Sequence, residues 1–220
     1  MSDIFKSRKT IVFDMDGTVL NTLDDLTASM NYVMEKFGFP IHPAEKYRSA
    51  FGNGIRYALE MTVPHGTPAD VIDGMIPVFK SHYDAHCLDY TRPYDGIIPL
   101  MRQLKECGYK MAIASNKIDS AVAELCERFF SDVVDVAIGE KTGVKRKPAP
   151  DMIFCALDEL GASAGDAVYI GDSEVDLKTA QNSSLPCILV LWGFRDRDFL
   201  KDIGGETFAE SPRDILDILM

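Results

Sequence analysis

The sequence lacks the features that mark disulfide-rich, zinc-binding and membrane-spanning proteins. Its cysteines are odd in number and include no CxxC pair; the five lie at positions 87, 107, 126, 155 and 187. Neither a disulfide framework nor a zinc site is therefore expected. No apolar run approaches the ~18 residues of a membrane helix, and residues 1–9 are polar, without the apolar stretch of a secretion signal. We expect a cytoplasmic protein that does not bind a membrane.

Positive charge is also scarce. The 23 lysines and arginines are outnumbered by 34 aspartates and glutamates, which gives a formal net charge of −11. Such a surface repels a phosphate backbone, so general nucleic-acid binding is not expected, although a local pocket can still bind a small anion. With 46% hydrophobic residues in a chain of 220, a substantial buried core can form, either as one domain with an insertion or as two small domains.

Short apolar segments alternate with helical patterns along most of the chain. Strands are expected at residues 10–13, 110–114, 133–138, 167–170, 186–191 and 206–209, and helices at residues 96–107, 119–129, 151–160 and 174–181, with a last helix capped by Ser211. Strands that alternate with helices favour a parallel sheet covered on both faces, with right-handed crossovers. The predicted fold class is α/β, with a doubly wound, Rossmann-like parallel sheet as its core.

The stretch from residue 21 to residue 90 differs, because it contains no convincing strand pattern. Helices are expected from Thr22 onward and over residues 44–50, 54–62 and 68–86, with Gly and Pro between them. Thr22 and Asp25 have the spacing of a capping box at the start of the first helix. We therefore predict a small all-helical cap domain, residues 21–90, inserted after the first strand of a core formed by residues 1–20 and 91–220.

The first motif whose residues could take part in catalysis directly follows the apolar segment 10–13. It contains Asp14, Asp16, Gly17 and Thr18, and in an extended segment residues two apart point the same way, so the two carboxylates can converge. Two carboxylates at ~4 Å repel by roughly 4 kcal/mol at an effective dielectric of about 20. A hard cation such as Mg²⁺, or protonation of one carboxylate, must offset this repulsion. The alternative, a solvated acidic turn, is disfavoured by the position at the end of a buried strand.

Three further motifs also lie at the ends of predicted strands or in the loops between elements. Ser115 and Asn116 precede a helix and could bind an anion. Lys147 lies in a basic cluster of a very acidic chain and could contact a phosphoryl oxygen. Asp172 and Asp176 are one helical turn apart and can share a face. Taken singly, these motifs also fit a helix cap, an exposed basic turn and acidic residues that complement a helix dipole.

The common position of the four motifs is more informative than any one of them. In a doubly wound sheet, ligands bind beyond the carboxyl ends of the strands, where the strand order reverses. At that edge the motifs would supply a nucleophile, a metal site, an anion binder and a cation. Phosphoryl transfer requires these groups.

The ordered set of motifs resembles the haloacid dehalogenase-like hydrolase superfamily over essentially the whole chain. The helical insertion resembles the small cap of that family. Within the family, the sequence is most similar to phosphoglycolate phosphatases, on three segments: Ser115-Asn-Lys117, Phe51-Gly-Asn-Gly54 and Leu191-Trp-Gly-Phe-Arg195. The resemblance implies a Mg²⁺-dependent phosphomonoester hydrolase acting on a small phosphorylated metabolite, with phosphoglycolate favoured.

The resemblance also implies catalytic roles. Asp14 would attack phosphorus and form an aspartyl-phosphate, while Asp16 would protonate the leaving oxygen and then activate water. Ser115 and Lys147 would bind the phosphoryl oxygens.

The resemblance implies a metal site as well. Mg²⁺ would be held by Asp14, the backbone carbonyl of Asp16, and Asp172. Asp176 would support the water molecules bound to the metal. Thr18 and Asn116 are predicted to contact the substrate in the core. Asn53 and Arg56 are predicted to grip its non-phosphate end from the cap.

Three residues depart from the family pattern without touching the catalytic set. Asn21 stands where Asp is frequent, Ile118 where Pro is common, and Ser184 where a helix usually ends in Gly.

The same motifs also fit other functions. A sugar-phosphate mutase, a pyrophosphatase or a nucleotidase of the same superfamily would use the same catalytic residues. A receiver domain phosphorylated on aspartate belongs to another class, but receivers carry their acidic pair and acceptor on different strands and lack a helical insertion. The protein is expected to be a monomer or homodimer.

Overall fold

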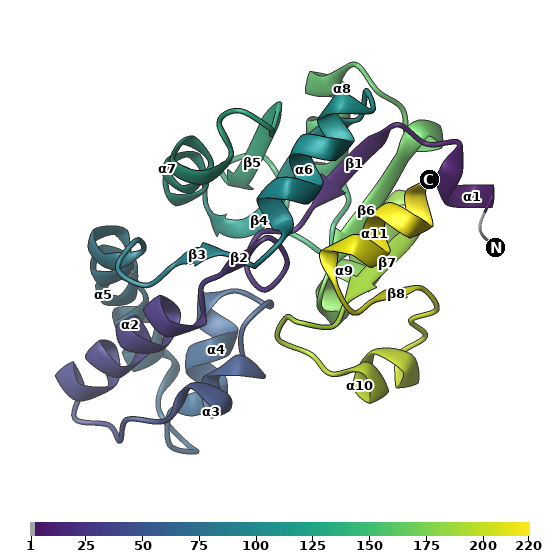
Figure 1. Cartoon of the computed structure of the whole chain (residues 1–220). Coiled ribbons are helices and arrows are strands. Elements are labelled where there is room, and N and C mark those ends of the chain that lie inside the picture. Colours follow the sequence, from purple (N-terminus) through teal and green to yellow (C-terminus); the bar gives the residue numbers. More distant parts are fainter. Residues whose placement is uncertain (1–2) are drawn as a thin grey trace. The chain divides into compact units, whose positions relative to one another are not determined.

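The structure, a computed structural model, describes residues 3–220 as two compact units (Figure 1). The sheet unit combines the chain up to Leu20 with Pro93–Met220, and the helical unit is Asn21–Arg92. The connections between the units are two short strands that pair with each other, β2 (Leu20–Asn21) and β3 (Arg92–Pro93). Each unit has its own buried apolar residues.

A six-stranded parallel sheet forms the centre of the sheet unit. In spatial order its strands are β5 (Val136–Glu140), β4 (Lys110–Ile118), β1 (Thr10–Phe13), β6 (Ala167–Gly171), β7 (Cys187–Val190) and β8 (Phe208–Ala209). The chain extends the sheet from β1 to β4 and β5, and then crosses to the other side of β1 at β6. The strand order therefore reverses at β1, and the carboxyl ends of β4, β1 and β6 lie side by side there. This confirms the predicted doubly wound α/β fold.

Helices cover both faces of this sheet because apolar side chains point alternately to its two sides. Ile11 and Phe13 of β1 belong to one hydrophobic cluster, with residues of α6, α7 and α11, whereas Val12 belongs to a second cluster, with residues of α8 and α9. Figure 1 shows α6 and α11 lying across one face. The helices of the unit are α1 (Asp3–Lys6), α6 (Ile97–Glu106), α7 (Asp119–Phe130), α8 (Asp151–Leu160), α9 (Glu174–Ser183), α10 (Arg197–Asp202) and α11 (Pro212–Leu219), with a 3-10 turn at Ala164–Asp166.

The helical unit contains α2 (Leu23–Lys36), α3 (Ala44–Arg48), α4 (Ile55–Thr62) and α5 (Ala69–His86). Residues 22–91 are all described, and none of them lies in a strand. Helices α2 and α5 pack together, and the buried interior includes Met30, Val33, Leu59, Met75 and Phe79. Within the described residues, no helix has both the length and the apolar composition needed to cross a bilayer.

Strand β4 is longer than predicted and changes the surroundings of Ser115. It continues to Ile118 through a register shift between Ala114 and Ile118, because Ile118 still pairs with Glu140 of β5. Ser115 therefore lies within the strand and not after its end, whereas α7 begins at Asp119, as predicted. The expectation that the strand ends at Ala114 was wrong.

The predicted capping box at the first helix was also wrong. Thr22 is the N-cap residue of α2 but forms no side-chain cap hydrogen bond. The buried Asp25 carboxylate accepts instead from the backbone N–H groups of Tyr90 and Thr91, at 2.8–3.1 Å. These N–H groups belong to the segment that follows α5, and only the folded unit brings them to Asp25. The predicted cap at Ser211 is observed, with Asp214 completing a capping box, whereas the short helices α1 and α10 were not predicted.

Candidate active site

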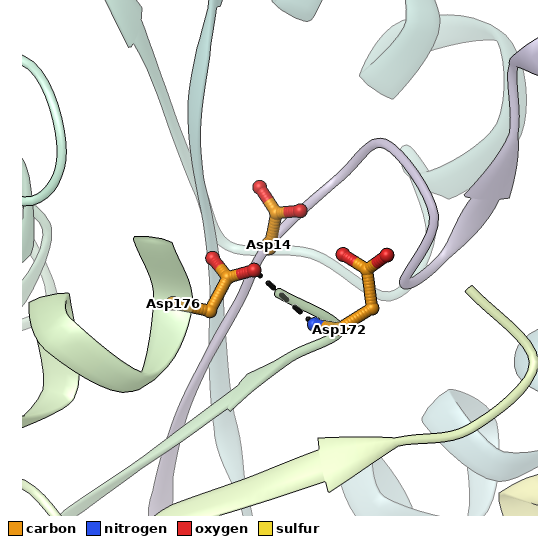
Figure 2. Close-up of side chains that lie close together, drawn as sticks. All are labelled: Asp14, Asp172 and Asp176. Atoms are coloured by element: carbon orange, nitrogen blue, oxygen red, sulfur yellow. Dashed lines mark hydrogen bonds between the residues drawn. The ribbon is translucent and has the colours of Figure 1, made fainter. Parts of the chain in front are cut away.

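Three buried carboxylates meet at the carboxyl edge of the sheet (Figure 2). Asp14 follows β1, Asp172 follows β6, and Asp176 lies in the first turn of α9. One ligand oxygen of each lies within 4.8 Å of the others, and among the described residues this is the one such group of three. Their exposed fractions are 6%, 1% and 1%. The fold thus brings together aspartates from two motifs that are more than 150 residues apart.

Lys147 supplies the positive charge of this cluster. Its ammonium group lies 2.5 Å from Asp14 Oδ1 and 2.9 Å from Asp176 Oδ1, and it donates to the hydroxyl of Tyr169 at 2.9 Å. Tyr169 in turn donates to Asp176 Oδ1 at 2.8 Å. Although burial opposes it, the charges of Asp14 and Asp176 raise the pKa of Lys147 above its usual range. Lys147 is therefore held as a cation.

Asp176 is satisfied on both oxygens by donors from the protein. Its Oδ2 accepts from the hydroxyl of Ser173 at 2.6 Å and from the backbone N–H groups of Ser173 and Asp172 at 3.0 and 3.2 Å. Burial would raise its pKa, but the charge of Lys147 and the side-chain hydrogen bonds from Ser173, Lys147 and Tyr169 outweigh burial and lower the pKa below its usual value. Asp176 is thus suited to orient its neighbours rather than to bind an ion directly.

Asp14 and Asp172 carry negative charge that the protein does not fully compensate. Burial first, and then the charge of Asp176, raise the pKa of Asp14 to about 7, although Lys147 opposes the rise. Burial and the charges of Asp176 and Asp14 also raise the pKa of Asp172 well above its usual value. Three carboxylates face one ammonium group here, so two negative charges remain when all are ionised.

A divalent cation fits this arrangement. Carboxylate oxygens are the ligands that Mg²⁺ and Ca²⁺ prefer, and an ion of charge two would neutralise the excess on Asp14 and Asp172. Gly17 also fits a ligand site, because it has a positive φ of 86° and a side chain there would come within 2.4 Å of Asp172 Oδ2. The residues present can therefore hold a divalent metal.

Asp16 is separate from the three buried carboxylates. Its Oδ1 forms a salt bridge with Lys117 Nζ at 2.9 Å, and the Lys117 side chain is only 5% exposed. Asp16 is the more accessible partner, with 20% of its side chain exposed. The second aspartate of the first motif thus faces a different lysine from the first aspartate.

The other predicted residues of the core lie around this cluster. Ser115 is buried, and its Oγ accepts from the backbone N–H of Lys117 at 3.2 Å. Asn116 donates to the backbone carbonyl of Lys147 at 3.0 Å and so links β4 to the loop that carries the lysine. The Thr18 hydroxyl lies 3.5 Å from Asp14 Oδ2 and 3.4 Å from an oxygen of Asp172.

The two predicted cap residues belong to the helical unit. Asn53 lies in the turn between α3 and α4, and Arg56 lies in the first turn of α4. Arg56 forms exposed ion pairs with Glu60, at 3.0 Å, and with Asp73.

Sequence reasoning missed three contributors to the site. Lys117 was noted only for its resemblance to a family, Tyr169 was read as a strand residue, and the backbone N–H of Phe194, which donates to Asp172 at 2.5 Å, carries no side-chain signal. Tyr169 could have been found from the sequence. It lies near the end of β6, two residues before Gly171, and a buried tyrosine hydroxyl needs a hydrogen-bond partner, which here is provided by Asp176 and Lys147.

Comparisons with known proteins find relatives that match most of the chain. A protein-family model described as haloacid dehalogenase-like hydrolase matches residues 11–190. A phosphoglycolate phosphatase of Mesorhizobium japonicum is 30% identical over 199 residues, which cover 87% of this chain and 86% of that protein. One of Xanthomonas campestris is 28% identical, with 85% of each chain covered.

A solved structure is similar throughout. It comes from Lactobacillus delbrueckii subsp. bulgaricus and is provisionally described as a phosphoglycolate phosphatase. The TM-score is 0.93 at 35% identity, and the match covers 97% of this chain and 99% of that one. These matches confirm the resemblance that the motifs predicted.

Proposed function

Because the chain belongs to the haloacid dehalogenase-like hydrolase family and is a phosphatase, we propose that it hydrolyses a small phosphomonoester through an aspartyl-phosphate on Asp14, with Mg²⁺ as cofactor. The observation that carries the proposal is the position of Asp14. Its carboxylate lies at the end of the central strand, 2.5 Å from a buried lysine and beside Asp172. Phosphoglycolate is the favoured substrate, since relatives over most of the chain carry that name.

In the first step, an Asp14 oxygen attacks phosphorus, and the bond from phosphorus to the ester oxygen breaks. Lys147, charged and 2.5 Å from Asp14 Oδ1, would balance charge on the phosphoryl oxygens, with the buried Ser115 hydroxyl as a second contact. Asp16 donates its proton to the leaving oxygen. Since Asp16 is more exposed than Asp14, a substrate can reach it.

In the second step, Asp16 takes a proton from water, and the water oxygen attacks the phosphorus of the aspartyl-phosphate. The bond between phosphorus and Asp14 breaks, which releases inorganic phosphate and regenerates both aspartates.

Asp14, Asp172 and the backbone carbonyl of Asp16 would hold Mg²⁺, with Asp176 orienting the site through Ser173 and the backbone of Asp172. When bound, the cation supplies charge neutralisation for the phosphoryl group and keeps Asp14 ionised, although its pKa is about 7 without metal. Thr18 and Asn116 contribute polar groups nearby.

The helical unit serves as the cap in this proposal. Asn53 and Arg56 would contact the non-phosphate end of the substrate, and closure would exclude water from the reaction. The predicted cytoplasmic location also belongs to this proposal.

The test is phosphate release from a panel of phosphorylated metabolites that includes phosphoglycolate, with and without Mg²⁺, for wild type and Asp14→Asn. We expect Mg²⁺-dependent release that the substitution abolishes. Release that survives Asp14→Asn would rule out this nucleophile. A higher kcat/KM for a sugar phosphate or nucleotide than for phosphoglycolate would overturn the substrate assignment.

A further inference from the structure

The segment that follows β7 contacts the candidate metal site through Phe194. The backbone N–H of Phe194 donates to Asp172 Oδ2 at 2.5 Å. Two residues earlier, the indole Nε1 of Trp192 donates to the backbone carbonyl of Thr18 at 3.0 Å. Thr18 and Asp172 follow different strands, so this segment is tied to both sides of the site.

Close packing brings the segment onto Asp172. A side chain at Gly193 would lie 2.3 Å from Asp172 Oδ2 and 2.5 Å from the carbonyl oxygen of Gly17. Only glycine leaves room for the backbone to run directly over this carboxylate, and that approach places the next N–H group, that of Phe194, within hydrogen-bonding distance.

Arg195 anchors the far end of the segment. Its guanidinium forms a two-pronged ion pair with Glu174, with Nε 2.7 Å from Oε2 and Nη2 2.9 Å from Oε1. Arg195 is only 7% exposed. Glu174 is the first residue of α9, two positions after Asp172 and two before Asp176. The pair therefore joins the segment to the start of the helix that completes the carboxylate cluster.

We propose that Arg195 is a positioning residue for the divalent-cation site. Its ion pair with Glu174 fixes residues 192–195, so that the Phe194 N–H holds Asp172 Oδ2 and leaves Oδ1, which accepts a long hydrogen bond of 3.4 Å from the Thr18 hydroxyl, for the cation. A two-pronged arginine–carboxylate pair fixes direction as well as distance, which a lysine would not do. This inference rests on the proposed function in one respect, namely that Asp172 binds the cation.

The test measures Mg²⁺ binding without substrate, by calorimetric titration and by the Mg²⁺-induced rise in melting temperature. For Arg195→Met we expect the Kd for Mg²⁺ to rise about 10-fold, as for other residues that orient metal ligands. Glu174→Gln should raise it by a similar factor. The double variant should bind no more weakly than either single one, because both substitutions break the same pair.

A matched control lies two residues away. Arg197 also pairs with a glutamate, Glu210, through a contact of 2.6 Å, but on the surface, where the Glu210 side chain is 75% exposed. Arg197→Met should leave the Kd for Mg²⁺ unchanged. Should Arg195→Met fail to fold in chelator, Arg195→Lys keeps the charge but loses the two-pronged geometry, and we expect it to weaken Mg²⁺ binding as well.

The proposal is overturned if folded Arg195 variants bind Mg²⁺ as wild type does, or if Arg197→Met weakens binding equally. Wild type that binds no Mg²⁺ would overturn the metal site itself and this inference with it. Normal Mg²⁺ binding by wild type, with only the variant effect missing, would overturn this inference alone.

Discussion

The sheet unit has buried as well as exposed ion pairs, whereas the ion pairs of Arg56 in the helical unit are exposed. In the sheet unit, the side chains of Lys147, Lys117 and Arg195 are 3%, 5% and 7% exposed, and each is paired with a carboxylate of the candidate site or next to it. In the helical unit, the side chain of Arg56 is 38% exposed, and its acidic partners, Glu60 and Asp73, are 44% and 56% exposed.

This difference indicates that the buried basic side chains contribute to catalysis rather than to the stability of the fold. Burying an ion costs several kcal/mol even when it is paired, and an exposed pair contributes only about 0–1 kcal/mol. A chain selected for stability alone would gain little from three buried basic side chains at one edge of a sheet. Their concentration around Asp14, Asp16 and Asp172 therefore supports a catalytic centre in the sheet unit.

The largest effect is expected when this buried charge is removed. Lys147→Met leaves Asp14 and Asp176 without their cation, so phosphate release should fall on the order of 10³-fold. Without metal at neutral pH, the free energy of unfolding should fall by about 3–5 kcal/mol. Arg56→Met, which breaks exposed pairs in the helical unit, should cost no more than about 1 kcal/mol. Urea unfolding in chelator measures both, and equal losses would contradict the comparison.

A more selective effect is expected at the second buried lysine. Lys117→Met removes the salt bridge that holds Asp16, so proton donation to the leaving oxygen should suffer. Alkyl phosphates need that proton, so their kcat/KM, which reports the steps up to departure of the leaving group, should fall about 100-fold. The kcat/KM for p-nitrophenyl phosphate, whose leaving group needs no proton, should change much less. A uniform loss of kcat/KM on both substrates would show that Lys117 does not act through Asp16 as the proton donor.

The pH dependence of stability tests the uncompensated charge on Asp14. Its pKa is raised from 3.8 to about 7 in the folded protein, so the folded state binds a proton that the unfolded state releases. The contribution of Asp14 to stability is greatest below pH 3.8 and is lost as the pH rises through about 7. The melting temperature of metal-free wild type should therefore fall across this range, and that of Asp14→Asn should fall less. Identical slopes would exclude Asp14 as the cause.

The sequence was sufficient for those parts of the molecule that local pattern determines. Apolar strands, helical periodicity and the motifs at strand ends predicted the sheet, and the rule that ligands bind where strand order reverses predicted that Asp14 and Asp172 would meet. Asp25 shows the limit of this reasoning. Its spacing from Thr22 fits a capping box, but its actual partners, Tyr90 and Thr91, are brought near only by the folded unit.

The same limit explains what was missed at the site. The pairing of Lys117 with Asp16 depends on how β4 continues past its register shift, which no pattern in the sequence specifies. The contact between Phe194 and Asp172 is made by a backbone group, so the identity of the side chain carries no information about it.

The smallest effect is expected at Ser184, a neutral residue that lies outside both sets of ion pairs. Among the described residues it is the one non-glycine residue with a positive φ, 58°, and it caps the end of α9 in the left-handed conformation that favours Gly. Ser184→Gly removes strain of about 1 kcal/mol, part of which is offset by the greater freedom of glycine in the unfolded chain. We expect a net gain of about 0.5 kcal/mol in the free energy of unfolding. Ser184→Ala, which keeps the strain, should give none.

Phosphate release by Ser184→Gly should not change, because Ser184 is exposed and uncharged. A loss of activity would show that the end of α9 influences Asp176 at the start of the same helix. The site would then depend on more than its buried charges.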